Sequence, residues 1–166
     1  MGSIKTKVQD TLYGNYLTAT VRVVMGALFI YSSLFKLMDP VSFSRVIANY
    51  GVLPAALLPY GALFVPGLEM VLGLALLAGF RIRTSSFLSL LLMGAFIAVI
   101  SLNVARGNSF DCGCFELERF GLSETIGPGI IARDTTLAAL LLLVFRARRH
   151  VFSLDRALEK RELENL

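Results

Sequence analysis

The sequence predicts an all-α integral membrane protein built as a bundle of four transmembrane helices. Its 166 residues are 55% hydrophobic with a mean hydropathy of +0.69, which is too apolar for an ordinary soluble domain. The apolar residues form continuous blocks of about 20, the helix length that crosses a bilayer. They do not alternate with polar residues as the strands of a membrane barrel do. We therefore expect four spans, at about residues 16–35, 57–80, 85–104 and 130–145.

The first two spans each contain a feature that needs explanation. A charged start precedes the first block, as in a secretory signal peptide, but no small-x-small cleavage site follows Tyr31-Ser32-Ser33. We therefore expect an uncleaved membrane anchor.

The connection over residues 36–56 is expected to be a loop or a short interfacial helix, with Phe43, Ile47 and Tyr50 as surface anchors. The second block contains prolines, which membrane helices tolerate when neighbouring groups satisfy the freed carbonyls.

The last two spans are bounded by clear turn signals. Residues 81–84 form a tight connection, so the second and third spans should be antiparallel neighbours. Gly127-Pro128-Gly129 breaks the chain before the fourth span. Two short hairpins of this kind favour an up-down bundle. We predict that residues 1–150 form this membrane domain and that residues 151–166 form a charged cytoplasmic tail.

Lysine and arginine in the short connections predict the orientation, because cytoplasmic loops carry an excess of both. The basic residues of the leading segment, the second connection and the tail fall on one side of the membrane. Both termini are therefore expected inside, and residues 105–129 outside, in a multi-pass protein of the inner (cytoplasmic) membrane. The net charge of +4 follows from this topology. Nucleic acid is not an expected partner, because the basic residues flank spans and lack interleaved aromatic residues.

Cys112 and Cys114 are the only cysteines, and they lie in this third connection within Asp111-Cys112-Gly113-Cys114-Phe115. A disulfide across one residue closes a very small ring, and Gly113 supplies backbone freedom without removing all strain. Strained, exposed disulfides are the labile ones. Such a bond also constrains little of the unfolded chain. These arguments favour a redox role for the pair over a structural one.

Two other roles for the cysteine pair stay open at this point. It could close a structural loop that shapes a docking surface, or hold a soft ion such as Cu(I) between two thiolates. A four-ligand zinc site is not available, because the single histidine, His150, is expected on the opposite side. We therefore predict no resident metal. With only one pair, electrons must pass to a soluble partner, to a quinone, or to both in turn.

Several polar residues are candidates to support the cysteines. A cation such as Lys36 or Arg133 would lower the pKa of a nearby thiol, whereas Asp111 would oppose that effect. Each cation could equally be an interfacial residue with its charge in the headgroup region. Asp134 follows Arg133, and the two are expected to pair with each other or to frame the loop. Phe115 is expected to seat the loop on the membrane.

Glu69 lies in the middle of the second span, where an ionised carboxylate is costly and is usually paired or functional. Arg22 is the expected partner, because their predicted depths differ by about 7–8 Å at 1.5 Å per residue, which an arginine can largely cover. The pair would fix the helix register, or it would contribute a proton route or a quinone contact.

Four segments together resemble the DoxX-like superfamily, and most closely its MauE-type methylamine-utilisation membrane proteins. The resemblance covers about residues 17–146 and rests on Arg22-x3-Gly26-x2-Phe29-Ile30-x5-Lys36-Leu37, Tyr50-Gly51-Val52-Leu53-Pro54, Pro66-x2-Glu69 and Asp111-Cys112-Gly113-Cys114-Phe115. It implies a four-helix membrane protein associated with redox maturation of periplasmic proteins, often with a thioredoxin-like partner. The methylamine-utilisation members are linked to maturation of a disulfide-rich dehydrogenase subunit.

The sequence therefore predicts a membrane thiol–disulfide oxidoreductase whose extracytoplasmic Cys112–Cys114 pair exchanges disulfides with thioredoxin-like partners or maturing proteins. The alternatives are a non-enzymatic assembly subunit with a structural disulfide and a soft-metal carrier. The chain carries no flavin or nicotinamide fingerprint. A quinone, near the loop and the outer ends of the first and fourth spans, is the one common cofactor that we retain. The direction of electron flow stays open.

Overall fold

The computed structural model describes residues 2–108 and 127–147, with side chains described from residue 16 onward. Its elements are α1 (Gly2–Met38), α2 (Pro40–Tyr50), the 3-10 turn η1 (Ala55–Leu57), α3 (Leu58–Ala78), α4 (Ile82–Ala105) and α5 (Pro128–Arg146). Among the described residues, four stretches are long and apolar enough to cross a membrane: Tyr16–Met38, Ala55–Ala78, Ile82–Ala105 and Pro128–Arg146. The predicted all-α fold with four membrane-spanning helices is confirmed, and the protein is a multi-pass membrane protein. The orientation stays a prediction.

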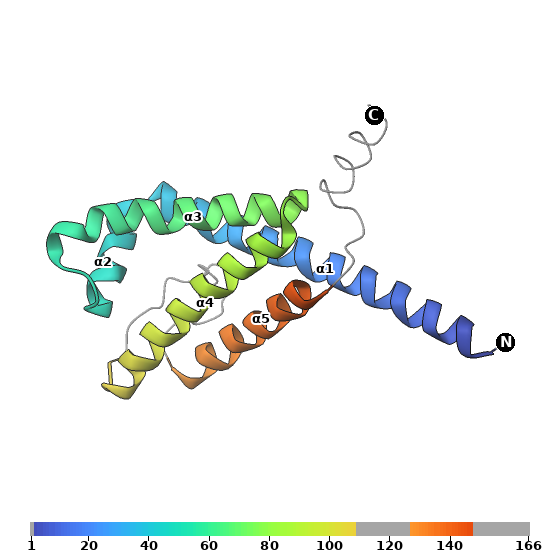
Figure 1. Cartoon of the computed structure of the whole chain (residues 1–166). Helices are drawn as coiled ribbons and strands as arrows, with labels where there is room; N and C mark the ends of the chain where they lie inside the picture. The colour runs from blue at the N-terminus through green and yellow to red at the C-terminus, as the bar shows by residue number, and fades with distance from the viewer. Residues whose placement is uncertain (1, 109–126, 148–166) are drawn as a thin grey trace, which may run out of the picture.

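The four long helices form a closed ring in which each packs on two neighbours. α1 packs on α3, α3 on α4, α4 on α5, and α5 back on α1 (Figure 1). The tight turn between α3 and α4 makes these two helices antiparallel. Gly79 makes that turn possible, because it adopts a left-handed conformation with φ of 68° at the end of α3.

The contact between α1 and α3 brings the two helix backbones together at Gly26 and Gly73. A Cβ atom added at Gly73 would lie 2.9 Å from the carbonyl oxygen of Gly26 and 2.8 Å from Cγ1 of Ile30. A Cβ atom added at Gly26 would lie 2.9 Å from the carbonyl oxygen of Gly73. Small residues allow this kind of close approach between membrane helices. The absence of a side chain at these two positions therefore sets the distance between α1 and α3.

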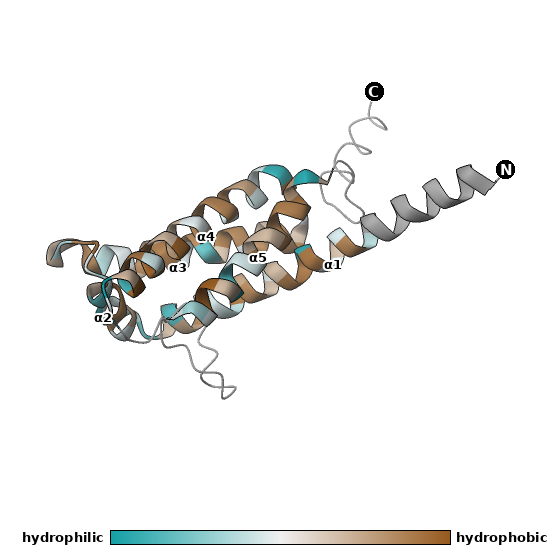
Figure 2. Ribbon diagram, turned by 90° about the horizontal axis from the view of Figure 1, so that it is seen from below, coloured by the Kyte–Doolittle hydropathy of each residue, from teal (hydrophilic) through white to brown (hydrophobic). Residues whose placement is uncertain are grey.

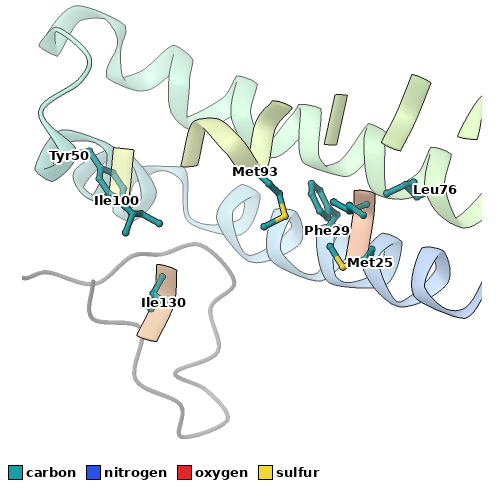
Figure 3. Packing of buried hydrophobic residues seen from close by; sticks show 8 residues of the cluster. Met25, Phe29, Tyr50, Leu76, Met93, Ile100 and Ile130 are labelled. Carbon is teal, nitrogen blue, oxygen red and sulfur yellow. The ribbon is translucent and has the colours of Figure 1, made fainter. Parts of the chain in front are cut away.

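Apolar side chains lie both inside and outside the bundle, as expected for a membrane protein. Figure 2 shows hydrophobic residues covering most of the four spans, and many large ones are exposed, including Phe64 at 70% and Val71 at 63%. A buried cluster runs through the interior, and Figure 3 shows seven of its eight members by name. Most of the exposed large apolar side chains lie within the spans, where they face the lipid bilayer.

The helix α2 corrects one expectation from the sequence. Asp39 caps its first turn by accepting the Ser42 backbone N–H at 3.0 Å, and Gly51 ends it in a left-handed conformation. Phe43, Ile47 and Tyr50 do not anchor a membrane surface, because all three are buried in the protein. They recur on one face of α2, which packs on α3 and α4. This helix therefore covers one end of the bundle.

Candidate functional site

The cysteine pair lies outside the described residues, together with Asp111, Gly113 and Phe115. The described chain stops before this segment at Asn108 and resumes at Gly127. α4 ends and α5 begins at the end of the bundle that carries α2 (Figure 1). The described residues at that end therefore form the base from which the cysteine segment leaves and to which it returns.

Asn103 joins three parts of this base. Its side-chain amide donates hydrogen bonds to the backbone oxygens of Tyr50 at 3.2 Å and Val99 at 3.0 Å. Its side-chain oxygen accepts a hydrogen bond from the amide of Asn108 at 2.8 Å. The side chain is buried, where an amide that lost its partners would be costly. Asn103 thus connects the end of α2 to α4 and to Asn108, the last described residue before the cysteine segment.

Glu69 of α3 and Lys36 of α1 form a buried ion pair. The Nζ atom of Lys36 lies 2.9 Å from both carboxylate oxygens of Glu69, and the Ser32 hydroxyl donates to Oε2 at 3.4 Å. Lys36 is 1% exposed and Glu69 is 5% exposed. Two hydrogen bonds donated by the ammonium and a third donated by the hydroxyl are the kind of geometry that compensates for burying charge.

Two phenylalanines complete the environment of the Lys36 ammonium. It lies 5.1 Å from the ring centroid of Phe43 in α2 and 5.5 Å from that of Phe96 in α4. Both distances are within the range of a cation–π interaction. Lys36 is therefore a buried residue at a junction of four helices, rather than an interfacial residue with its charge in water.

The expected pairing of Arg22 with Glu69 is wrong. Glu69 binds Lys36 and Ser32, which lie toward the other end of α1. Arg22 precedes Lys36 by 14 residues, which corresponds to roughly 21 Å along a helix at 1.5 Å per residue. That separation exceeds the reach of an arginine side chain. Arg22 is itself buried at 2% exposure, near the N-terminal end of the span Tyr16–Met38.

Arg133 and Asp134, in the second turn of α5, form the predicted pair. The Nε atom of Arg133 lies 2.9 Å from Oδ1 of Asp134. The Asp134 side chain is 2% exposed and that of Arg133 is 26% exposed, so the carboxylate points into the protein and the guanidinium reaches its edge. The pair lies shortly after the cysteine segment rejoins the bundle at Gly127.

An apolar pocket of about 160 Å³ lies beside this base, between α2, α3 and α4. No polar atom faces it. Its walls are Phe43, Ile47, Tyr50, Val52, Leu53, Val65, Leu92, Ala95, Phe96 and Val99. Phe43 and Phe96 contact the Lys36 ammonium, so the ion pair lies behind two walls of the pocket.

Sequence reasoning missed Asn103, Ser32 and this pocket. The visible signal for the pocket was the spacing of Phe43, Ile47 and Tyr50, which fall on one face of a helix and so predict burial. For Asn103, the signal was a single amide inside an otherwise apolar span, where polar side chains usually hydrogen-bond to another part of the protein.

Comparison with known proteins identifies relatives across most of the chain. Residues 14–147 match the model of the family described as methylamine utilisation protein MauE. The chain is 30% identical over 125 residues to the protein of that name from Paracoccus denitrificans, covering 75% of this chain and 66% of the relative. It is 29% identical over 136 residues to that of Paracoccus versutus, covering 81% and 72%.

The protein of the same name from Methylophilus methylotrophus is 30% identical over 143 residues, covering 85% of this chain and 72% of the relative. No solved structure matches the chain. The family match covers all four membrane spans and the cysteine segment between α4 and α5. This chain belongs to the MauE family of methylamine utilisation proteins.

Proposed function

We propose that this protein is a membrane thiol–disulfide oxidoreductase in which Cys112 and Cys114 exchange disulfides with extracytoplasmic proteins. The observation that carries the proposal is the position of its only cysteine pair, in a segment whose two ends are rooted at the same end of a closed helical bundle. Such a segment can be presented to a soluble partner while its roots stay fixed. The strain of a one-residue disulfide ring supports exchange over a structural role.

The exchange proceeds by thiolate attack on a disulfide. In the oxidising direction, a substrate thiolate attacks the Cys112–Cys114 disulfide, forms a mixed disulfide and releases one cysteine as a thiolate. A second substrate thiolate then resolves the mixed disulfide. The substrate loses two electrons and two protons, and the cysteine pair gains them as a dithiol. The reverse sequence reduces a substrate disulfide.

We place the cysteine segment on the extracytoplasmic side of the inner membrane and a thioredoxin-like protein among its partners. The excess of basic residues on the opposite side supports this orientation. The names of the relatives support a role in methylamine utilisation. Within that role, we propose maturation of an extracytoplasmic protein as the task. In this reading Arg133 and Asp134 help to hold the base of the segment, and Phe115 seats it on the membrane.

Trapping of a mixed disulfide tests the proposal. In Cys112→Ser or Cys114→Ser, one thiol remains without its resolving partner, so one variant should accumulate a covalent adduct with an extracytoplasmic protein. The adduct should disappear on reduction and should be absent from the Cys112→Ser/Cys114→Ser double variant. If the single variants lose stability or partner docking without any adduct, the pair is structural. If the reduced pair instead binds one Cu(I) and forms no adduct, the chain is a metal carrier.

The orientation has its own test. A membrane-impermeant maleimide added to intact cells after mild reduction should label Cys112 and Cys114. The same reagent should leave the double variant unlabelled. Labelling that requires a permeabilised membrane would place the cysteines in the cytoplasm and contradict the proposal.

A further inference from the structure

The pocket between α2, α3 and α4 has the chemistry of a site for a short stretch of hydrocarbon. Its volume is about 160 Å³ and its lining presents no polar atom. Apolar cavities of about 150 Å³ stay dry and accept a guest as large as benzene, so the pocket has room for about six carbon atoms of a chain. A polar group that entered would lose its hydrogen bonds with water and find no replacement. The lining therefore selects a purely apolar guest.

The pocket is open to the lipid bilayer. Ala95 lines it, is exposed, and belongs to the membrane span Ile82–Ala105. Val52 and Leu53, in the connection that follows α2, also line the pocket and are exposed at 49% and 37%. The hydrocarbon that meets Ala95 within the span consists of lipid acyl chains. An acyl chain is therefore the apolar guest that the membrane itself supplies.

A cation lies on the same face of α4 as the pocket, at the end of the span. Arg106 directly follows the span, is exposed, and keeps right-handed helical backbone angles. It comes 7 residues after Val99 and 11 residues after Ala95, which both line the pocket, and these spacings put the three residues on one helix face. The rise from Val99 to Arg106 is roughly 10 Å at 1.5 Å per residue. Because a guanidinium binds phosphate well, Arg106 suits the phosphate of a lipid headgroup.

We propose that this side of the bundle binds one phospholipid, with part of an acyl chain in the pocket and the headgroup phosphate at Arg106. One lipid molecule carries both groups, so it can make both contacts at once. The walls of the pocket include Phe43 of α2, Val65 of α3 and Val99 of α4. A chain held among them joins α2 to the other two helices and stabilises the helix that covers the buried ion pair. The site is separate from the proposed thiol chemistry.

Two alanines on α4 provide a matched test of the pocket. Ala95 lines the pocket, whereas Ala98 is exposed on the same helix and does not line it. Native mass spectrometry of the full chain, released from detergent, would count the bound molecules of dipalmitoylphosphatidylglycerol and give the Kd. Binding should saturate at one lipid per chain. Ala95→Phe fills the pocket and should raise the Kd about ten-fold or more, whereas Ala98→Phe should change it less than about two-fold.

Two arginines at the same end of the bundle test the headgroup contact. Arg106→Gln should raise the Kd about five-fold, because a basic residue near the surface contributes about that factor to the binding of an anionic lipid. Arg45 lies on the face of α2 roughly opposite Phe43 and Ile47, so Arg45→Gln should change the Kd less than about two-fold. Both arginines are exposed, so neither substitution should disturb folding.

Each result supports or overturns the lipid site. Binding without saturation, or equal Kd values for Ala95→Phe and Ala98→Phe, would indicate ordinary boundary lipid and overturn the pocket. Equal Kd values for Arg106→Gln and Arg45→Gln would overturn the headgroup contact. Glycerol 3-phosphate carries a phosphate without a chain and should not displace the lipid; displacement would also contradict the proposal. The bound lipid should raise the midpoint of thermal unfolding of the unchanged chain but not that of Ala95→Phe. Failure of the lipid site leaves the proposed thiol–disulfide exchange standing, because none of these measurements involves the cysteines.

Discussion

The same two helices, α1 and α3, meet in two physically different ways along their length. In the middle, Gly26 and Gly73 bring the backbones so close that neither position has room for a Cβ atom. Toward the end that carries α2, the space between them holds the charged side chains of Lys36 and Glu69 and the Ser32 hydroxyl. Close backbone packing is sufficient to hold membrane helices together. Buried ion pairs are weak stabilisers against an apolar alternative, so the polar end is where a functional requirement is expected.

The largest effect should follow from breaking the ion pair on one side only. Glu69→Leu leaves the Lys36 ammonium buried without its carboxylate, which should lower the free energy of unfolding by about 3–5 kcal/mol. Lys36→Met/Glu69→Leu removes both charges and should recover most of that loss. Equilibrium unfolding in detergent measures both. A double variant as unstable as the single one would mean that the pair itself stabilises the bundle.

A smaller loss should follow from adding one methyl group in the middle of the interface. Gly73→Ala forces a Cβ atom against the Gly26 carbonyl and Ile30, so the free energy of unfolding should fall by about 1–3 kcal/mol. Gly67→Ala, on the same helix, meets open space and should be neutral or slightly stabilising. Thermal unfolding of the two variants side by side provides the measurement. Equal effects would show that α1 and α3 do not pack through Gly73.

Asn103→Leu should have a similar or smaller effect on stability and an additional effect on the cysteines. Loss of the hydrogen bonds of its buried amide, which would leave the buried Tyr50 carbonyl without this donor, should cost about 1–3 kcal/mol. The root of the cysteine segment would also lose its link to α2, so the alkylation rates of Cys112 and Cys114 should change. Leu102→Ala, at an exposed neighbouring position, is the control. Unchanged alkylation in Asn103→Leu would show that Asn103 does not position the segment.

The smallest expected effect is a pH dependence at the start of α2. The backbone N–H of Ser42 donates to Asp39 and, with other local contacts, lowers the pKa of that carboxyl below its usual range. The cap therefore stabilises the fold at neutral pH, and its contribution is lost as the pH falls below the ordinary aspartate pKa of about 4. As the pH falls through this range, the midpoint of thermal unfolding should decrease slightly less for Asp39→Asn than for the unchanged protein, because asparagine caps the helix without titrating. An identical pH profile in both proteins would assign the dependence to other groups.

The contrast between the middle of the α1–α3 interface and its end near α2 also explains what the sequence predicted well and what it did not. The spans were predictable because the bilayer requires long apolar blocks, and these are visible without any knowledge of packing. Glu69 was predicted to be paired because an ionised carboxylate in the middle of a span is costly. Its partner was misassigned because Lys36 seemed to lie at a membrane surface. That expectation assumed that no helix covers the end of the bundle at which Lys36 lies.

The cover over Lys36 comes from α2, an 11-residue amphipathic helix that hydropathy alone does not reveal. Once Phe43 lies over the ammonium, Lys36 is enclosed and can pair only inside the protein. The pocket arises from the same arrangement, because its walls come from α2, α3 and α4 together. Such sites depend on tertiary packing between segments far apart in sequence, and no single segment encodes them.

The reduction potential of the Cys112–Cys114 pair tests the central claim most directly. The full chain in detergent would be equilibrated in dithiol redox buffers of graded potential, and its free thiols counted after alkylation, with the Cys112→Ser/Cys114→Ser variant as the blank. The account predicts a reversible two-electron transition at a potential clearly above about −300 mV, the region below which structural disulfides are found. A pair that stays oxidised down to that potential, or that never forms a disulfide, would contradict a thiol–disulfide oxidoreductase.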